Sequence, residues 1–439
     1  MKALIHPEQL KGHTVVIAGA GRSGLAAADL AQALGARVRV LEKNPDFDEA
    51  ALAGCKISRA QLILGEHKKE HFQDADMVII SPGIPVRSLK NLVPDTAMIF
   101  SELEFASWFT HEPIIAVTGT NGKTTTTMLI AHALEKMGKK VFAGGNLGVP
   151  LARYVLDPEE CDILVLEVSS FQLEGCSGFH PRVGVFLNFS ANHLDHHTSG
   201  EEYFRAKTRL FRRQTQDDLA IIALELRQEM ENSGLLKSGR VYFTASNKFS
   251  CPELSGKHNR ANMEAAFLAC RYFGMDESGF SRALNDFAAP AHRQEVFLKY
   301  EGRIYVNDSK ATTVAAMSAA LEAFEKPVRL LAGGVYKGGD FSELTFLIRS
   351  KAAKVYLFGA GREIFEKAWQ DEVSMEYYST LEQAVDKAVS ESAPGDTLLL
   401  SPGTSSFDLF RDYRERGGAF KSLVRKRLGL PDIEDVQGK

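Results

Sequence analysis

The stretch IIAVTGTNGKTTTT, residues 114–127, decides the fold class that we predict for this chain. It begins with an apolar run typical of a buried strand, continues through a glycine-rich loop and enters a helical pattern. Loop glycines let a backbone wrap around phosphate groups, while Lys123 can reach the outer phosphates and Thr124 can ligate Mg²⁺. Val117 stands where a complete Walker pattern has its first glycine. The strand–loop–helix order still predicts a nucleoside triphosphate site.

Similar series of strands, turns and helices on both sides of this stretch predict an α/β fold with parallel sheets. The segment HTVVIAGAG, residues 13–21, leads into a helical pattern that another strand follows. A third series begins near Arg303, where apolar runs again alternate with helical patterns. We expect three α/β domains, which span residues 1–104, 105–290 and 291–439.

The bulk composition favours a soluble protein that binds neither nucleic acid nor membrane. The formal net charge is −4, which gives no general attraction to a nucleic-acid backbone. Five cysteines without a C-x-x-C pair indicate reduced thiols. The first residues lack the apolar core of a signal peptide, and no run reaches the ~18 apolar residues that span a bilayer. We therefore expect a cytoplasmic location.

A second glycine loop, GAGRSG at residues 19–24, follows the first strand and opens a helix. Glu42 ends the next strand, which completes the context of a dinucleotide fingerprint. A tight turn without a ligand is one interpretation of this loop, and an NAD-dependent oxidoreductase is another. Any diphosphate suits a helix N-terminus with open N–H groups, so a UDP-linked molecule fits equally well.

Downstream of the phosphate loop, the apolar run 163–166 ends at Glu167. A carboxylate at a strand tip beside such a loop is well placed to hold Mg²⁺. His193, Asp195 and two further histidines follow close together, without the spacing of a zinc finger. A hard-metal site that uses one histidine with carboxylates and a solvated loop both remain open for this cluster.

Two lysines are candidates for charge-based roles. Residues 201–211 read as a helix that places Tyr203, Lys207 and Leu210 on one face. A lysine whose stem packs on such a face is ordinary, so the pattern alone does not make Lys207 catalytic. Lys337 lies between glycines in residues 331–344, where it can capture a carboxylate or phosphate or simply belong to a surface loop.

The motifs taken together resemble the Mur ligase family in order and spacing. They are AVTGTNGKTTT, GGNLG (144–148), LEVSSFQLE, NHLDHH with YFRAK, GKHNRAN (256–262), AHRQE, VNDSKAT (306–312) and the segment 398–420. With GAGRSG and SPGIP (81–85), they cover nearly the whole chain. SSFQLE, SPGIP and SPGTSSFDLFRDYRERG look most like the branch that adds D-glutamate.

This resemblance implies the activity and the architecture. An N-terminal Rossmann-like domain binds the UDP substrate, a central P-loop ATPase-type domain binds ATP, and a C-terminal Rossmann-like domain binds the amino acid. ATP phosphorylates the carboxylate of UDP-N-acetylmuramoyl-L-alanine, and the amine of D-glutamate attacks the acyl phosphate. The implied role is peptidoglycan precursor synthesis in the bacterial cytoplasm, by a protein that we expect to be monomeric.

The resemblance also assigns roles residue by residue. The catalytic group comprises Lys123, Glu167, His193 and Lys207. The ATP group comprises Gly119, Thr120, Asn121, Gly122, Lys123, Thr124, Thr125, Asn262, Arg293 and Asp308. Two Mg²⁺ ions are expected on Thr124, Glu167, His193 and Lys207, the last as a CO₂-derived carbamate. The UDP group comprises Arg22, Ser23, Glu42, Lys43, Asn44 and Ser81, and Asn146 contacts the muramoyl-peptide arm. The D-glutamate group comprises Lys310, Thr312, Lys337, Ser406, Phe407 and Tyr413.

Two positions depart from the pattern of the family. Asn192 stands where the family commonly has aspartate, and His196 where it often has arginine. Three rival functions remain: a ligase of the same architecture that adds another amino acid or acts on folate, the NAD-dependent oxidoreductase, and a nucleotide-binding module without turnover. The amino acid that triggers phosphate release, a change in nicotinamide absorbance, and ATP binding without hydrolysis distinguish them.

Overall fold

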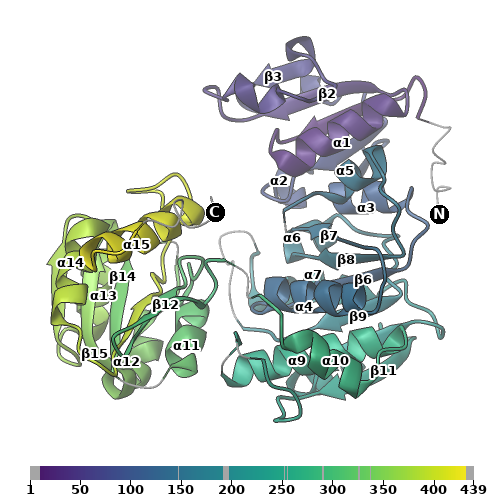
Figure 1. Ribbon diagram of the computed structural model, residues 1–439. Coiled ribbons are helices and arrows are strands. Elements are labelled where there is room, and N and C mark those ends of the chain that lie inside the picture. Colours follow the sequence, from purple (N-terminus) through teal and green to yellow (C-terminus); the bar gives the residue numbers. More distant parts are fainter. Residues whose placement is uncertain are drawn as a thin grey trace. The chain divides into compact units, whose positions relative to one another are not determined.

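A computed structural model describes residues 10–431 except 147, 191–196, 252, 255, 289–290, 325–326 and 337. The chain divides into two compact units. The first comprises Met1–Thr244 and Asn262–Ala283, and the second comprises Ala245–Ala261 and Leu284–Lys439. Each of the three predicted domain ranges contains one sheet (Figure 1). The boundaries at 104/105 and 290/291 stay predictions.

The first sheet of unit 1 is fully parallel, with the strand order β3-β2-β1-β4-β5. Its strands are β1 (Thr14–Ala18), β2 (Arg37–Glu42), β3 (Leu62–Leu64), β4 (Met77–Ile80) and β5 (Met98–Ser101). Its helices are α1 (Arg22–Ala33), α2 (Val86–Leu89) and α3 (Glu102–Ser107). All five residues of β1 are buried, as expected for a central parallel strand covered on both faces. The order in which strands are added to the sheet reverses between β1 and β4. In α/β folds, ligands bind beyond the carboxyl ends of the strands at such a point.

The second sheet of unit 1 is also fully parallel, with the order β11-β10-β9-β6-β8-β7. Its strands are β6 (Ile114–Thr118), β7 (Val141–Gly145), β8 (Ile163–Glu167), β9 (Val183–Phe186), β10 (Leu219–Ala223) and β11 (Gly239–Phe243). The helices of this region are α4 (Lys123–Lys136), α5 (Leu151–Leu156), α6 (Ser170–Glu174), α7 (Gly200–Thr208), α8 (Arg227–Asn232), α9 (Lys257–Tyr272) and α10 (Glu277–Leu284). Because β6 lies between β8 and β9, the phosphate loop meets the carboxyl ends of both neighbours.

Unit 2 contains a third sheet with the order β12-β13-β17-β14-β15-β16, in which only β12 is antiparallel to its neighbour. Its strands are β12 (Glu295–Tyr300), β13 (Arg303–Asn307), β14 (Val328–Gly333), β15 (Ala352–Phe358), β16 (Met375–Tyr378) and β17 (Thr397–Leu400). Its helices are α11 (Val314–Ala323), α12 (Thr345–Lys351), α13 (Arg362–Trp369), α14 (Leu381–Glu391) and α15 (Tyr413–Arg427). Alternate residues of the strands face two separate cores, so helices cover both faces.

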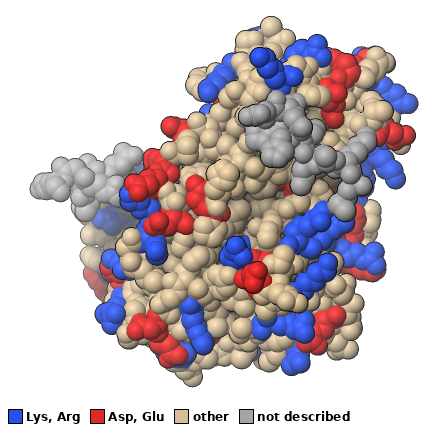
Figure 2. Space-filling model, turned by 90° about the vertical axis from the view of Figure 1, so that its right-hand side faces the viewer, with Lys and Arg blue, Asp and Glu red and all other residues tan. Residues whose placement is uncertain are grey.

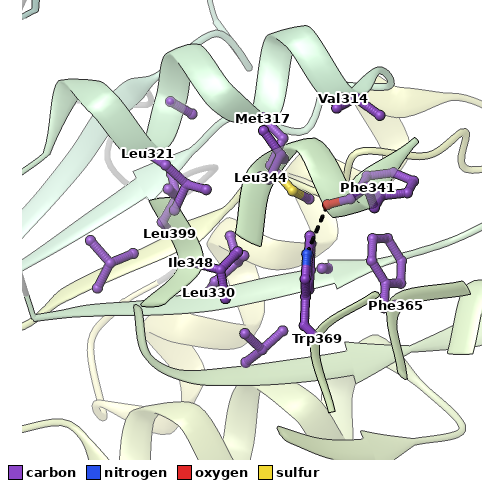
Figure 3. Packing of buried hydrophobic residues seen from close by; sticks show 14 of the residues in the cluster. Val314, Met317, Leu321, Leu330, Phe341, Leu344, Ile348, Phe365, Trp369 and Leu399 are labelled. Carbon is purple, nitrogen blue, oxygen red and sulfur yellow. Dashed lines mark hydrogen bonds between the residues drawn. The ribbon is translucent and has the colours of Figure 1, made fainter. Parts of the chain in front are cut away.

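The core beneath α11, α12 and α13 shows how these helices are fixed to the sheet (Figure 3). Trp369 is fully buried against the rings of Phe341 and Phe365. Its indole Nε1 donates a hydrogen bond of 2.9 Å to the main-chain oxygen of Phe341. A buried tryptophan whose N–H has a partner adds apolar contact without an unsatisfied polar atom.

The surface carries both signs of charge. On the face drawn in Figure 2, Lys and Arg side chains are interspersed with Asp and Glu side chains, in line with the net charge of −4. Among the described residues, none of the helices has the length and apolar character needed to cross a membrane.

Candidate active site

The phosphate loop between β6 and α4 contains two glycines whose backbone conformation other residues rarely adopt. Gly122 has φ +81° and Gly119 has φ +152°, a region in which side chains are strained. A Cβ atom on Gly122 would also lie 2.4 Å from Oδ1 of Asn262, which α9 places against the loop. The loop thus leads into the N-terminus of a fourteen-residue helix, whose first N–H groups have no partner within the helix.

Lys123 begins this helix and folds back onto the loop. Its Nζ donates to the main-chain oxygens of Gly119 at 3.0 Å and of Thr120 at 2.9 Å. The ammonium group therefore lies within the loop, at the position from which a lysine neutralises phosphate oxygens.

Glu167, at the tip of β8, is buried beside the loop with two neutral donors on its carboxylate. The hydroxyl of Thr124 donates to Oε2 and the amide of Asn146 donates to Oε1, both at 2.5 Å. A second bond joins the backbone N–H of Asn146 to the main-chain oxygen of Glu167 at 2.8 Å. Hydroxyl and carboxylate oxygens are hard ligands of the kind that Mg²⁺ prefers, so Thr124 and Glu167 fit a magnesium site.

The histidine predicted to complete that site, His193, lies outside the described residues, as do Asn192 and His196. Within the described part of the chain, no three His, Cys, Asp or Glu side chains are grouped closely enough to hold a metal ion. His197, the last histidine of the cluster, is buried and its Nε2 shares a hydrogen bond of 3.0 Å with the hydroxyl of Ser170.

Lys207 and Tyr203 are buried on α7, which ends at Thr208, and Leu210 is buried in the single 3-10 turn Arg209–Phe211 that follows. The α-helix is thus shorter than the predicted range of residues 201–211, although the three predicted side chains are buried. Its Nζ donates to the main-chain oxygen of Gly119 at 2.8 Å and lies 4.5 Å from the centre of the Tyr203 ring. Burial and the nearby Lys123 ammonium hold the pKa of Lys207 well below its ordinary value, although Glu167 opposes them. The environment therefore favours a neutral amine at this position.

Sequence reasoning missed Asn188, which lies just beyond the end of β9. Its amide group makes two hydrogen bonds with the backbone of Asn121, and its main-chain oxygen accepts a third bond from the N–H of Thr120. The only signal for Asn188 in the sequence was its position, as a polar residue directly after an apolar run. The strand order was needed to show that β9 lies next to β6.

The first glycine loop has a different support. Glu42, at the end of β2, accepts hydrogen bonds of 2.9 Å from the backbone N–H groups of Ala20 and Asn44. A Cβ atom on Gly19 would lie 2.7 Å from the Cβ of Ser81, so the loops after β1 and β4 meet at the change of strand direction. The UDP group thus gathers around one edge of the first sheet, with Arg22, Lys43 and Asn44 exposed, Ser23 and Glu42 half-buried and Ser81 buried.

In unit 2, Asp308 directly follows β13 and is buried. Its carboxylate accepts from the hydroxyl of Ser401 at 2.9 Å and from the N–H of Gln294 at 3.1 Å. Burial raises the pKa of Asp308 to about 7, against the opposing effect of these hydrogen bonds. The neighbouring Arg293 is half-buried between two residues with positive φ, His292 and Gln294.

Two members of the D-glutamate group, Lys310 and Tyr413, are in contact. Nζ of Lys310 lies 4.9 Å from the centre of the Tyr413 ring. Burial raises the pKa of Tyr413, but Lys310 and Arg414 outweigh it and leave that pKa below its ordinary value. Ser406 is buried, Thr312 is half-buried and Phe407 is 63% exposed. Lys337 lies outside the described residues.

A buried arginine that was not predicted connects the strand tips of unit 2. Arg416, from α15, donates to the hydroxyl and the main-chain oxygen of Ser309 and to the main-chain oxygens of Gly333 and Thr404. Gly333 is the last residue of β14, while Ser309 and Thr404 follow β13 and β17, so one guanidinium group joins three strand ends at the same edge of the sheet.

Parallel sheets with a lysine-bearing phosphate loop beside a buried strand-tip carboxylate define a class of nucleotide-binding α/β proteins. Comparison with known proteins narrows that class. Residues 117–250 match the Mur ligase middle domain, and residues 292–403 match the Mur ligase, glutamate ligase domain. Residues 7–100 match the C-terminal domain of alanine dehydrogenase/PNT, which agrees with a Rossmann-like first sheet.

Named relatives span almost the full length of the chain. UDP-N-acetylmuramoylalanine--D-glutamate ligase of Desulfovibrio desulfuricans is 48% identical over 420 residues, covering 94% of this chain and 96% of the relative. The protein of the same name from Desulfitobacterium hafniense is 35% identical and covers 96% and 99%. The chain therefore belongs to the Mur ligase family.

Solved structures support the fold. MurF ligase from Thermotoga maritima, in complex with ADP, has a TM-score of 0.61 at 17% identity and covers 97% of both chains. UDP-N-acetylmuramate-alanine ligase MurC from the same organism has a TM-score of 0.55 at 18% identity and covers 97% and 100%.

Proposed function

We propose that this protein is an ATP-dependent ligase that joins D-glutamate to UDP-N-acetylmuramoyl-L-alanine during peptidoglycan precursor synthesis. The observation that carries the proposal is 48% identity, over 94% of the chain, to a relative named for this reaction. The arrangement of Lys123, Thr124 and Glu167 around the phosphate loop supports ATP as the energy source. A monomer in the cytoplasm, with a role in cell shape and division, completes the proposal.

The reaction has two balanced steps. A carboxylate oxygen of the muramoyl-alanine attacks the γ-phosphorus of ATP, forming an acyl phosphate while the bond to ADP breaks. The amine of D-glutamate then attacks the acyl carbon, a C–N bond forms, phosphate leaves and the nitrogen loses a proton. The first step brings anions together, so positive charge in a dry site is its main requirement. Lys123 supplies such a charge from within the loop.

Magnesium is assigned to Thr124, Glu167, His193 and a carbamate on Lys207. When bound, Mg²⁺ neutralises phosphate charge and orients the phosphate oxygens. The hydroxyl oxygen of Thr124 and the carboxylate oxygen Oε2 of Glu167 are buried and lie 2.5 Å apart, so both are placed to act as metal ligands, which supports this assignment. Asn146, predicted to contact the muramoyl-peptide arm, also orients Glu167 through its amide hydrogen bond.

The carbamate on Lys207 rests on the surroundings of its amine. An ammonium ion would repel a nearby cation, whereas a carbamate is an anionic oxygen ligand. Only a neutral amine adds CO₂, forming an N–C bond and releasing a proton. The burial of Lys207 and its proximity to Lys123 favour that neutral amine.

In unit 2 we assign Arg293 and Asp308 to ATP, and Lys310, Thr312, Lys337, Ser406, Phe407 and Tyr413 to D-glutamate. A dicarboxylate substrate needs cationic partners, and Lys310 and Lys337 are the lysines of this group. Charge-assisted hydrogen bonds contribute on the order of 1.5–3 kcal/mol each. Lys310→Ala and Lys337→Ala are therefore expected to raise KM for D-glutamate at least about tenfold and to leave KM for ATP nearly unchanged. Equal losses for both substrates would remove these lysines from the amino-acid pocket.

The decisive assay measures phosphate release with ATP, Mg²⁺, UDP-N-acetylmuramoyl-L-alanine and a panel of D- and L-amino acids. D-glutamate is expected to trigger release, with the coupled UDP-muramoyl dipeptide identified by its mass. Release with another amino acid would assign the chain to a different substrate within the family. Nucleotide binding without release for any amino acid would overturn the ligase assignment.

A further inference from the structure

We infer that Asn188 is a positioning residue that holds the phosphate loop in its nucleotide-binding conformation, an inference that deepens the proposed function and rests on it. Asn188 follows β9, and its side chain meets the loop that follows β6. Oδ1 accepts from the backbone N–H of Asn121 at 2.9 Å, and Nδ2 donates to the main-chain oxygen of Asn121 at 3.1 Å. Its own main-chain oxygen accepts from the N–H of Thr120 at 3.1 Å.

These three bonds fix three successive peptide groups of the loop, which join residues 119 and 120, 120 and 121, and 121 and 122. Because Asn188 satisfies both the N–H and the oxygen of Asn121, the peptide planes before and after that residue cannot rotate freely. The next residue, Gly122, has a left-handed conformation and is the N-cap of α4. The orientation of the Asn121 peptide therefore determines where the N–H groups of the first turn of α4 point, and N–H groups at a helix N-terminus are suited to bind phosphate.

Ser190 reinforces the same connection. Its backbone N–H donates to the hydroxyl of Thr120 at 3.1 Å, and that hydroxyl donates back to the main-chain oxygen of Ser190 at 3.3 Å. Gly119 is also held close, since a Cβ atom there would lie 3.1 Å from the Cβ of Leu187 and 3.4 Å from the N atom of Asn188. Residues 187–190 thus follow the loop from 119 to 121 along its length.

Only an amide side chain meets both requirements at position 188. A carboxylate of the same shape keeps the acceptor but loses the donor to the Asn121 oxygen, and it adds a negative charge beside the phosphate site. An alanine loses both bonds without adding charge. Comparing Asn188→Asp with Asn188→Ala therefore separates loss of positioning from charge repulsion.

The test measures binding of Mg²⁺ with a non-hydrolysable ATP analogue to the full-length protein by calorimetry. Asn188→Ala is expected to weaken binding about tenfold through the lost hydrogen bonds. Asn188→Asp is expected to weaken it further, with the extra loss shrinking at high salt because the repulsion is screened. Asn232→Asp, at an exposed residue of α8, makes the same chemical change away from the loop and is expected to bind like the parent.

Steady-state kinetics and thermal unfolding separate positioning from general stability. A positioning role raises KM for ATP while KM for D-glutamate and the unfolding temperature stay near the parent values. Asn188→Ser, which keeps a small hydrogen-bonding group, carries the same expectation if the charged variant does not fold. Nucleotide binding of all Asn188 variants equal to that of Asn232→Asp overturns the inference. If no variant, nor the parent, ligates D-glutamate but nucleotide binding still falls at Asn188, the proposed reaction fails and the positioning role stands.

Discussion

Two glycine loops in unit 1 share one backbone plan but differ in the charge around them. Each follows a central strand of a parallel sheet and opens a helix, α1 after residues 19–21 and α4 after residues 119–122. The first is supported by the carboxylate of Glu42, and the second by the neutral amide of Asn188 with two amines converging on the Gly119 oxygen.

This difference indicates which phosphate each loop suits. An acid that accepts a loop N–H lowers the positive potential at the helix N-terminus, so a polyphosphate gains little there. Arg22 and Lys43 are exposed near this loop, and their two positive charges suit a less charged diphosphate such as UDP. Two amines with a threonine and a buried carboxylate instead suit a triphosphate with its metal. We therefore propose that the shared turn places a phosphate and that the supporting side chains select its charge.

The largest expected effect concerns Lys207 at the second loop. Lys207→Ala is expected to lose activity by at least about a hundredfold, because the site loses the anion assigned to hold Mg²⁺. If that anion is a carbamate, added acetate restores part of the activity and methylamine does not. The reverse pattern of rescue would show that Lys207 acts as a cation. Lys139→Ala, at an exposed position, serves as the control and should respond to neither.

Two glycines of the first loop provide a matched pair. A Cβ atom on Gly24 would lie 1.9 Å from the main-chain oxygen of Gly19, whereas on Gly21 it would meet nothing closer than Oγ of Ser81 at 3.5 Å. Gly24→Ala is expected to lower the free energy of unfolding by roughly 2–4 kcal/mol, because backbone must move. Gly21→Ala is expected to change it by less than about 1 kcal/mol. Urea unfolding measures the free energy of unfolding of both variants. Equal losses of this free energy would contradict the close packing of α1 on its own loop.

Glu42 tests whether the first loop serves the UDP substrate. Glu42→Ala removes the acceptor of the Ala20 and Asn44 N–H groups, so KM for UDP-N-acetylmuramoyl-L-alanine is expected to rise about tenfold with KM for ATP unchanged. Glu70→Ala, which removes an exposed glutamate of the same unit, is the control. A rise in KM for ATP alone would reverse the roles that we assign to the two loops.

The smallest expected effect comes from Glu102, which touches neither loop. Its carboxylate is fully buried and accepts from the N–H of Ala152 at 2.7 Å, and burial raises its pKa to about 7 despite this bond. Between the unfolded pKa of about 4.3 and this value, the folded state binds the extra proton, so stability contributed here falls as pH rises.

Glu102→Gln removes that titration. The free energy of unfolding of Glu102→Gln minus that of the parent is expected to increase by on the order of 1 kcal/mol from pH 5 to about pH 7. Above that pH the difference levels off. Urea unfolding across this pH range measures the change, with the exposed Glu159→Gln as control. A flat difference between parent and Glu102→Gln would mean that the carboxylate stays ionised in the fold.

Local patterns predicted the elements that carry the site. The helix expected after the phosphate loop is α4, the apolar run that ends at Glu167 is β8, and the periodic face of residues 201–211 buries Tyr203, Lys207 and Leu210. These predictions succeeded because strand and helix periodicity is written into neighbouring residues. Asn188, Arg416 and the contact between Asn146 and Glu167 escaped them, since each joins residues far apart in the chain.

The sequence by itself predicted three α/β sheets and two phosphate-type turns, because glycine spacing and apolar periodicity act within a few residues, and the resemblance of its ordered motifs indicated a ligase family. The sheets were expected to be parallel, and β12 is the exception because it pairs antiparallel with β13. Only the tertiary structure decided which side chains support each turn. Asn188 reaches Asn121 because β9 lies beside β6, and Glu42 reaches Ala20 because β2 lies beside β1. Strand order depends on how helices pack over both faces of a sheet, a property of the whole unit that no short stretch contains.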